Sequence, residues 1–568
     1  LLHSFRVTAG LPSSALPYGG WEAPNCELRG HCLGHYLSAC SLMYAATGDR
    51  RLKDRADTIV AELARCQEAL PKQGYHPGYL SAFPEGFFDR VETSGKVWAP
   101  YYTLHKIMAG LLDANHYCGN RQALDILRRL ADWVDFRVSR LSREQMQKAL
   151  ATEHGGMAES LAELYARTGD ARYLRLAQSF RHDAVFLPAA EGRDTLTGLH
   201  ANTQIPKFTG YQRIYELTGD PEYGAAARNF WKFVARDRSF VIGGDSTHEF
   251  FFPVEKFPEQ VKTVIGPETC NTYNMLKLTA RLFQDRPEGE LMDFYERALY
   301  NHILASEHPH EGGFVYYTSL RPGSFRSYSR DFGDFWCCVG TGMENHAKYG
   351  EVIYAHARDK LLVNLFIPSR LHWRAQGVTV TQETGFPAEP RTRLHFHLTE
   401  PKTFTVAVRY PRWVQPGALK VTVNGAAVAV HGRPGEYAEV TRAWKDGDEL
   451  TVDLPMRLTT EFLPRSTNYL AVLYGPVVLA GKLGREGLRD KDFRGQRLMM
   501  DQVLSADQTP VFTRPAEEIT RRIQPVPGRP LTFRTRDLAR PGDVTLIPFY
   551  RLHDERYAVY WRLADDHD

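Results

Sequence analysis

Three thiols and one carboxylate stand in two short stretches of this sequence that could carry out chemistry. Glu268 and Cys270 lie within residues 266–271, and Cys337 and Cys338 lie within residues 335–340. Each stretch comes before an apolar pattern of helical period, so both pairs are expected on turns that open helices. Thiolates with one carboxylate oxygen suit a single zinc ion. The sequence therefore predicts that these four residues bind Zn²⁺.

Cys337 and Cys338 have two other interpretations, a strained vicinal disulfide or a pair of packing thiols. The Glu268-x-Cys270 pair favours the metal over both, because it supplies further ligands of the right kind. Zinc and a helix N-terminus both lower the pKa of a thiol. One of the two cysteines is therefore expected to be ionised at neutral pH and able to attack a carbon atom.

A loop at 243–249 offers the proton donor that such a nucleophile needs. It begins with two glycines and carries His248 and Glu249 ahead of three phenylalanines. If the phenylalanines desolvate Glu249, its pKa rises and it can act first as an acid and then as a base; the alternative is a solvated loop carboxylate. A nucleophile and an acid/base about 5 Å apart are the arrangement of a retaining glycosidase.

The composition is that of a globular enzyme with more than one domain. The chain has 568 residues, a net charge of +3 and 12% aromatic residues. This small net charge does not indicate the strongly basic surface that binds nucleic acid. No apolar run approaches the roughly 20 residues that span a bilayer. The chain begins at Leu1 rather than Met, so an N-terminal segment is expected to have been cut away and any signal peptide is out of view. The bacterial periplasm or secretion is favoured over the cytoplasm on this ground. Both a monomer and a homodimer are compatible with the sequence.

Helical units with a glycine at the C-cap repeat along the first 350 residues. A return helix fits after each of the first four forward helices, and further forward helices are expected to start at Glu268 and near Cys337, the last running to residue 357. The caps are Gly48, Gly119, Gly169 and Gly219. Six helix pairs predict an (α/α)6 barrel over residues 1–358.

The apolar period changes from helical to two beyond residue 358. Residues 359–481 are expected to form a β-sandwich domain. Residues 482–568 are expected to form a second, smaller β-rich domain or an extension of the sandwich. The predicted fold class is thus α + β, multidomain, with the barrel followed by β-sandwich domains.

Histidines recur near the starts of the first four forward helices, where the fifth and sixth carry the carboxylate and the thiols. If the forward helices form the inner ring, all their starts surround one mouth of the barrel. The histidines then face the metal cluster across it. They are His35, His105, His154 and His200.

Three motifs, at 244–250, 268–278 and 335–346, closely resemble the zinc-thiolate β-L-arabinofuranosidases of glycoside hydrolase families 127 and 146. The resemblance covers the barrel and its sandwich tail. Val339 and Gly340 follow the cysteines where the first family has prolines, so the chain looks closer to family 146.

The resemblance implies a role for each matching residue. Cys337 would be the nucleophile that forms a thioglycosyl intermediate, and Glu249 the acid/base. Zn²⁺ would be held by Glu268, Cys270, Cys337 and Cys338. The substrate would be an arabinofuranoside-containing oligosaccharide or glycan. Its binding residues would include His105, His154, His200 and Tyr317, with His248 beside them and Trp98 stacking on the sugar beyond the cleaved bond.

Two alternatives remain open from the residues. Another toroid enzyme, such as a sugar epimerase or an unsaturated uronyl hydrolase, could use the histidines for acid/base work with a structural zinc. A carbohydrate-binding protein without catalysis would need only the aromatic surfaces.

Overall fold

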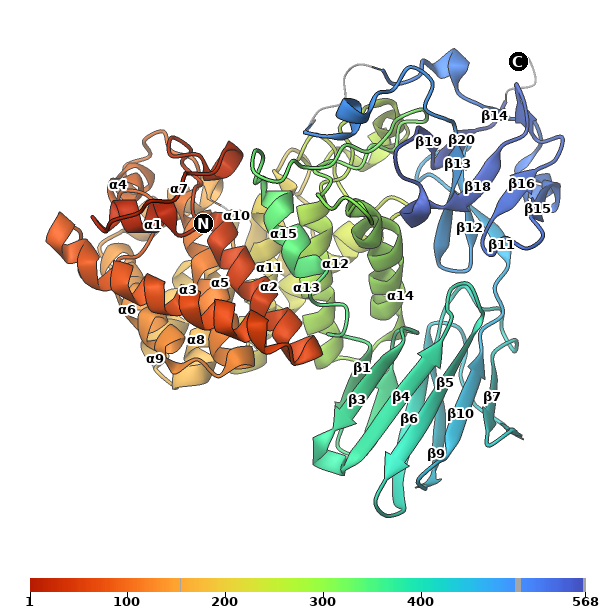
Figure 1. The fold of residues 1–568 in the computed structure, drawn as a ribbon, viewed down its shortest axis with the longest axis horizontal. Coiled ribbons are helices and arrows are strands. Elements are labelled where there is room, and N and C mark those ends of the chain that lie inside the picture. The colour runs from red at the N-terminus through yellow and green to blue at the C-terminus, as the bar shows by residue number, and fades with distance from the viewer. Residues whose placement is uncertain (154, 496–501, 565–568) are drawn as a thin grey trace.

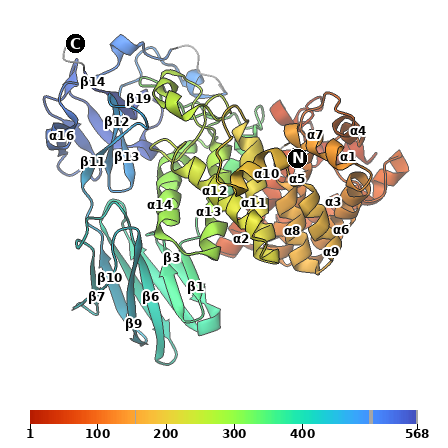
Figure 2. The same cartoon turned by 180° about the vertical axis from the view of Figure 1, so that it is seen from behind.

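The computed structural model describes residues 1–153, 155–495 and 502–564. A helical part made by residues up to about 350 lies beside two strand-rich parts (Figure 1). The view from behind shows the same division, with both strand-rich parts on the side of α14 (Figure 2). The predicted fold class, a helical domain followed by strand-rich domains, is confirmed.

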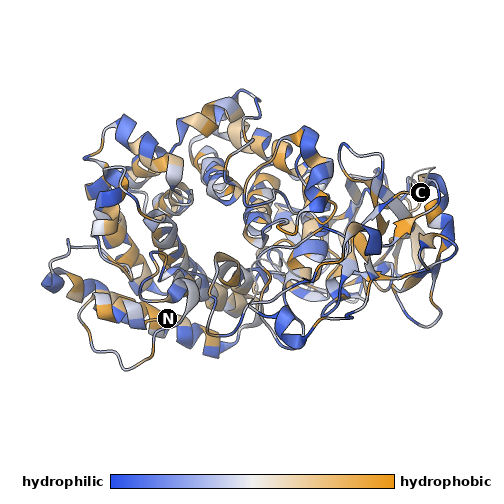
Figure 3. Cartoon of the chain, turned by 90° about the horizontal axis from the view of Figure 1, so that it is seen from above, coloured by the Kyte–Doolittle hydropathy of each residue, from blue (hydrophilic) through white to orange (hydrophobic). Residues whose placement is uncertain are grey.

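The inner helices of the helical part form a closed ring. Each contacts the next one along the chain, and the last returns to the first. Figure 3 looks down this ring and shows the second layer of helices outside it. Within the described residues the ring is made of α2 (His31–Thr47), α5 (Pro100–Cys118), α8 (Met157–Thr168), α11 (Ala201–Thr218), α13 (Thr269–Asp285) and α15 (Cys337–Asn345).

The turns between inner and outer helices explain the repeated Gly-Asp and Gly-Asn pairs. Each glycine caps an inner helix in the left-handed conformation, with φ of 68° to 72°. The next residue is the N-cap of the outer helix and accepts a backbone amide with its side chain. The outer helices that follow these caps are α3 (Arg50–Ala69), α6 (Arg121–Val138), α9 (Ala171–Ser179) and α12 (Pro221–Ala235).

The sixth helix pair differs from the prediction. The fifth inner helix is followed by α14 (Gly289–Ala298), but α15 ends at Asn345. The described chain after α15 turns into strand β1 (Tyr354–Ala357), where the sequence suggested more helix. Apolar side chains of 352–365 join the same buried cluster as the helices. The strand-rich part therefore covers the place that a sixth outer helix would take.

Shorter helices connect these elements. No helix among the described residues is both long and apolar enough to cross a bilayer. The connecting helices are α1 (His3–Thr8), α4 (Gly86–Glu92), α7 (Arg143–Thr152) and α10 (Asp183–Ala190).

The first strand-rich part is a two-sheet sandwich around a buried apolar core. One sheet has the order β1, β2 (Lys360–Val363), β6 (Lys402–Tyr410), β9 (Glu436–Trp444), and β2 and β6 run parallel. The other has the order β3 (Ser369–Trp373), β4 (Val378–Thr384), β5 (Arg391–Leu398), β10 (Glu449–Asp453), β7 (Lys420–Val423), β8 (Ala426–Val428).

The second strand-rich part is built on a different sheet, which begins at Leu458. The expected boundary at residue 481 therefore falls inside this part, because three strands assigned to the sandwich belong to one sheet with C-terminal strands instead. The sheet has the order β11 (Leu458–Phe462), β12 (Tyr469–Tyr474), β13 (Val477–Lys482), β18 (Thr545–Pro548), β16 (Phe533–Thr535), β15 (Ile523–Pro525). Strands β19 (Tyr557–Ala558) and β20 (Tyr560–Arg562) pair with β13 and β12, and a short ladder joins β14 (Val511–Phe512) to β17 (Ala539–Arg540).

Buried polar contacts fix both strand-rich parts to the barrel. The fully buried Arg409 of β6 pairs with Asp293 and Glu296 of α14. The Asn301 side chain, just after α14, donates to the Pro476 carbonyl and accepts from the Val478 amide beside β13. A buried charge that lost its partner would cost several kcal/mol, so these contacts define one arrangement of the parts.

Gly34 is the point where α2 and α5 cross at backbone distance. A Cβ at Gly34 would lie 2.2 Å from the Lys106 carbonyl carbon and oxygen, whereas a Cβ at Gly350 would meet nothing within 4 Å. We expect Gly34→Ala to lower the free energy of unfolding by about 2 kcal/mol or more, since the helices must separate. Thermal unfolding of Gly34→Ala and Gly350→Ala tests this. Equal melting temperatures would contradict the close crossing.

Candidate functional site

The three thiols and the Glu268 carboxylate meet at one point. One ligand atom from each of Glu268, Cys270, Cys337 and Cys338 lies within 4.8 Å of all the others. The Sγ atoms of Cys270 and Cys338 are 3.3 Å apart, and Cys337 Sγ is 3.1 Å from Glu268 Oε1. The adjacent Sγ atoms of Cys337 and Cys338 are 3.8 Å apart, and all eight cysteines are free thiols. The vicinal disulfide is therefore not formed.

This cluster has the properties expected of a metal site. All four side chains are buried, and Glu268 Oε2 has no hydrogen-bond partner among the described residues. Burial raises the pKa of each thiol well above its ordinary value. The helix N-terminus is thus not enough to ionise them, whereas a bound cation stabilises thiolates directly. The four residues could hold a metal ion.

Two helix starts bring these ligands together. Glu268 is the N-cap of α13, and Cys337 is the first residue of α15, which packs against α13. An extended segment, 314–318, runs alongside the α13 start. Its Tyr316 carbonyl accepts from the Thr269 amide at 3.2 Å, and its Thr318 amide donates to the Pro267 carbonyl at 2.9 Å.

The Glu249 carboxylate lies beside two tyrosines and a histidine. Tyr316 Oη and Tyr317 Oη both donate to Glu249 Oε1, at 2.7 and 2.6 Å. His200 Nε2 lies 3.7 Å from Glu249 Oε2. Burial alone would raise the pKa of Glu249, but His200, Tyr317 and Tyr316 outweigh it and bring the pKa to about 2.

The prediction of a Glu249 pKa raised by phenylalanines is therefore wrong. Phe250 is 45% exposed, and the groups that touch the carboxylate are polar. The backbone around Glu249 is strained, since His248 and Glu249 have positive φ angles of 53° and 71°. The Glu249 carbonyl accepts from the amide of Ala201 at 2.8 Å, which ties this strained loop to the start of α11.

A small cavity of about 90 Å³ joins the two halves of the site. Cys337, Glu249 and Glu268 line it, so the thiol and the acid/base candidate face one space. Its other lining residues are Trp21, Leu28, Trp98, Tyr102, His200, Asn202 and Tyr316.

Tyr316 and Asn202 are lining residues that the sequence analysis missed. Asn202 lies near Glu268, with Nδ2 and Oε1 3.5 Å apart, and accepts from Asn274 Nδ2 with its own amide oxygen. The signals were faint: Tyr316 precedes Tyr317 in an extended segment, and Asn202 follows His200 at a helix start. The sequence around Tyr316 and Asn202 does not indicate which residues they contact.

The N-terminal segment forms one wall of the cavity. The amide of Trp21 donates to the Asp334 carbonyl at 3.0 Å, and Gly20, with φ of 57°, leaves 1.9 Å between that oxygen and any Cβ. Only glycine allows this approach. It places the Trp21 ring 4.9 Å from the Trp98 ring, and Trp98 is 43% exposed at the rim.

Glu22, His31 and Cys32 form a second buried cluster of potential ligands next to the site. Both Glu22 oxygens accept backbone amides, from Gly30 at 2.8 Å and Cys32 at 3.0 Å. The His31 ring lies between the Phe335 carbonyl at 3.0 Å and Tyr102 Oη at 3.3 Å. These polar atoms already have hydrogen-bond partners. The cluster therefore caps the backbone amides at the start of α2 and contacts the turn before Cys337.

The other predicted sugar ligands lie in different places. His105 is buried, packs against Gly156 and lines a separate cavity of about 410 Å³ inside the ring. His248 is exposed and contacts Thr263 Oγ1 at 2.9 Å. His154 lies outside the described residues. Sugar binding by these three stays a prediction, whereas His200 and Trp98 do line the cavity beside the thiols.

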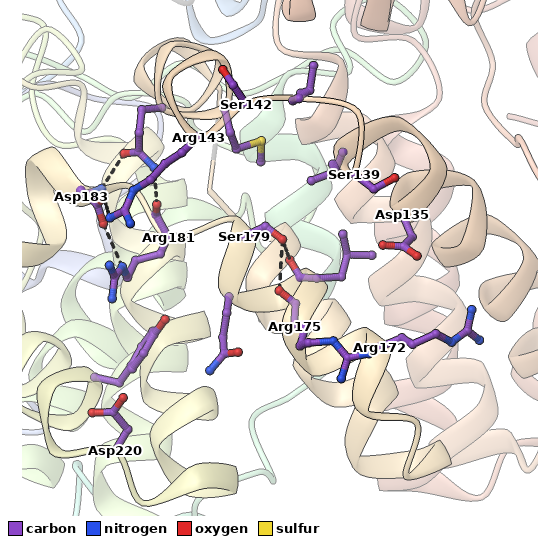
Figure 4. Close-up of a pocket in the computed structure, with 17 residues that line it drawn as sticks. Asp135, Ser139, Ser142, Arg143, Arg172, Arg175, Ser179, Arg181, Asp183 and Asp220 are labelled. Carbon is purple, nitrogen blue, oxygen red and sulfur yellow. Dashed lines mark hydrogen bonds and ion pairs between the residues drawn. The ribbon is translucent and has the colours of Figure 1, made fainter.

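A larger cavity, of about 720 Å³, lies between outer helices and shares no lining residue with the cavity beside the thiols (Figure 4). Two of its arginines, Arg143 and Arg181, both contact Asp183. It contains neither a thiol nor a histidine. Size therefore does not mark the reactive site in this protein.

Family models match along the chain. Residues 1–351 match the model of the β-L-arabinofuranosidase GH127 catalytic domain, and residues 360–456 match the GH127 middle domain. The chain belongs to the GH127 β-L-arabinofuranosidase family. The expected affinity with family 146 stays a prediction. Residues 459–563 match a domain of unknown function.

Individual relatives agree with this GH127 assignment. A non-reducing end β-L-arabinofuranosidase from Bifidobacterium longum subsp. longum is 25% identical over 510 residues, which cover 78% of this chain and 74% of that protein. A GH127 β-L-arabinofuranosidase from Geobacillus stearothermophilus T6 has the same fold, with a TM-score of 0.74 at 20% identity over 99% of this chain and 94% of that one. Another GH127 β-arabinofuranosidase aligns equally well, with a TM-score of 0.74 at 20% identity over 99% and 91%.

Metal content can be measured directly on this GH127 member. We expect about one metal ion per chain after dialysis, and we expect Cys270→Ala to lose most of it because one of four ligands is gone. Cys118→Ala is the matched control, since it also removes a buried free thiol. Elemental analysis gives the answer. Metal-free wild-type protein, or equal metal in both variants, would contradict the site.

Proposed function

We propose that this enzyme is a retaining glycosidase that releases terminal β-L-arabinofuranose from glycans. Cys337 is the nucleophile, Glu249 is the acid/base, and Glu268, Cys270, Cys337 and Cys338 hold Zn²⁺. The observation that carries the proposal is that Cys337 and Glu249 line one small cavity in a chain of this family. A purely structural zinc is normally closed to reactants by its ligands, but here two of the four ligands, Glu268 and Cys337, line the cavity.

Two displacements account for retention. The Cys337 sulfur attacks the anomeric carbon, the bond to the aglycone oxygen breaks, and Glu249 gives that oxygen its proton. Glu249 then takes a proton from water, the water oxygen bonds to the same carbon, and the carbon–sulfur bond breaks. When bound, zinc would lower the pKa of the thiols and stabilise sulfur as a leaving group.

The environment of Glu249 suits its second role before substrate arrives. With a pKa of about 2 it is a carboxylate at neutral pH, ready to take a proton. In the first step it must carry one. We infer that a sugar entering the cavity takes over hydrogen bonds from the tyrosines or separates Glu249 from His200, and so raises the pKa of Glu249.

The aglycone has an open aromatic surface at the rim. Trp98 is 43% exposed and stands edge-on to Trp21. Aromatic faces pack well against the apolar faces of sugar rings. We propose that the sugar beyond the cleaved bond lies on Trp98, and that a glycan rather than a free arabinoside is the substrate.

Replacing the nucleophile tests the chemistry. We expect Cys337→Ser to reduce kcat on a chromogenic β-L-arabinofuranoside by about a thousandfold or more, since removal of a nucleophile has effects of this size or larger. Zinc content and melting temperature are measured on the same sample, with Cys118→Ser as the control thiol. Full activity of Cys337→Ser would exclude this residue as the nucleophile.

Removing one hydroxyl beside Glu249 tests the acid. Tyr317→Phe deletes a hydrogen bond that lowers the pKa of Glu249, so that pKa rises. Because the first step needs protonated Glu249 in the substrate complex, the alkaline limb of kcat, which reports that complex, is expected to move to higher pH. Tyr354→Phe, which loses hydrogen bonds inside the sandwich, is the control. A limb that stays in place or moves to lower pH in Tyr317→Phe argues against Glu249 as the acid.

A further inference from the structure

The residues matched by the domain of unknown function form backbone hydrogen bonds with a segment that leads to the site. Segment 493–495 of that domain lies beside 326–330, a stretch of the catalytic part. The Tyr328 amide donates to the Phe493 carbonyl at 2.9 Å, and the Gly495 amide donates to the Tyr328 carbonyl at 2.8 Å. These two bonds form a parallel β-bridge between Tyr328 and Arg494.

The same ladder continues to the tyrosine pair. Tyr328 also bridges Val315, and the Ser329 amide donates to the Phe314 carbonyl at 2.9 Å. Two residues further on, Tyr317 bridges Glu268. An unbroken series of backbone contacts thus runs from the C-terminal domain, through the segment that carries Tyr316 and Tyr317, to the start of α13.

Side chains of the C-terminal domain reinforce this contact. Arg494 Nη1 donates to the Gly312 carbonyl at 2.7 Å, and its other nitrogen pairs with Glu311. Gly313, with φ of 86°, leaves 2.6 Å between the Ser329 carbonyl oxygen and any Cβ, and 2.7 Å between Arg494 Nη1 and that Cβ. A side chain there would disturb the backbone contact as well as the guanidinium. Phe493 packs edge-on against Phe325, at 5.5 Å between ring centroids.

A second contact clamps the other end of the tyrosine segment. The fully buried Tyr557 donates from Oη to the Ser319 carbonyl at 2.8 Å, and its amide donates to the Ser324 carbonyl at 2.8 Å. The C-terminal domain therefore grips residues 311–329 on both sides of Tyr316 and Tyr317. The catalytic part contacts the same segment at Pro267 and Thr269 and also after α14, where the Val315 amide donates to the Ser306 carbonyl at 2.8 Å and Arg326 donates to the Ala305 carbonyl.

We propose that the domain of unknown function, residues 459–563, positions the tyrosine pair that holds Glu249, with Arg494 and Tyr557 as its positioning residues. This inference rests on the proposed function for its catalytic consequence. Its structural part is independent: without this domain, segment 311–329 would expose its outer edge. The domain is then a supporting part of the active site, and not an appended binding module.

Arg494→Ala and Tyr557→Phe test the proposal, with Arg522→Ala as the control. Arg522 belongs to the same domain, and its partner Asp537 is a solvent-exposed residue. Hydrogen–deuterium exchange of the full-length protein is expected to become at least about tenfold faster at the amides of 314–329 in both test variants, because local opening costs less. The control variant should exchange like the wild type.

Kinetics give the second readout. We expect kcat/KM of Arg494→Ala to fall between tenfold and about a hundredfold, since a displacement near 1 Å at a catalytic group has effects of this size. The alkaline limb of kcat should shift in the same direction as in Tyr317→Phe, which a general loss of stability would not produce. Tyr557→Phe, which keeps the ring, should show a smaller shift of the same sign.

The outcomes separate this inference from the proposed function. Unchanged exchange at 314–329 in both test variants would overturn it. Faster exchange with an unmoved alkaline limb would also overturn it, because the tyrosines would not need the support. If the wild-type enzyme releases no arabinose, the proposed function is contradicted. The exchange experiment would still decide whether the C-terminal domain holds segment 314–329.

Discussion

The structure depends on keeping several acidic groups together in a buried space. Three thiols and the Glu268 carboxylate share one point, and the Glu249 carboxylate opens onto the same cavity. Burial together with the nearby Glu249 raises the pKa of Glu268. Because negative charges in this space repel one another, each ionised group needs its own hydrogen-bond donor or positive charge. Glu249 has Tyr316, Tyr317 and His200. Near the thiol cluster the described residues place two uncharged groups, Thr341 Oγ1 at 3.3 Å from Cys270 Sγ and Asn202 Nδ2 at 3.5 Å from Glu268 Oε1. A cation would supply positive charge there.

The closed ring supplies the geometry for this compensation. Helix starts provide turns on which adjacent or alternate residues can face one point, and α13 and α15 are neighbours in the ring. The ring closes tightly because glycines allow backbone contact: at Gly34 the helices α2 and α5 cross, and at Gly340 a Cβ would meet the His35 ring at 2.2 Å. A side chain at Gly34 would push α2 and α5 apart, and a side chain at Gly340 would displace His35 or the start of α15.

Much of the barrel and the meeting of Glu268 with three thiols could be predicted, because local signals encode them. A glycine C-cap followed by an Asp or Asn N-cap marks each of the first four helical hairpins, and a carboxylate and thiols at two helix starts have few other uses together. The absence of a sixth outer helix could not be predicted. The apolar residues at 352–365 are compatible with a helix and equally with strands that cover the barrel. The domain boundary failed for a similar reason, because β11 to β13 alternate like sandwich strands and only their pairing assigns them.

The environment of Glu249 shows the limit of sequence reasoning most clearly. The neighbouring phenylalanines suggested desolvation, but positive φ angles at His248 and Glu249 turn the carboxylate toward tyrosines almost 70 residues away in sequence. Those tyrosines are held in turn by a domain whose contacts leave no pattern in the sequence. Likewise, a histidine near a helix start can face the cavity, as His200 does, or the inside of the ring, as His105 does.

The central claim is that the Cys337 sulfur is the group that bonds to the sugar carbon. A haloacetyl derivative of β-L-arabinofuranosylamine would carry an electrophile into the cavity, and peptide mass spectrometry would locate the bond it forms. The account predicts a single adduct on Cys337, suppressed by excess L-arabinose. An adduct on Glu249 or on another cysteine, with Cys337 unmodified, would contradict it.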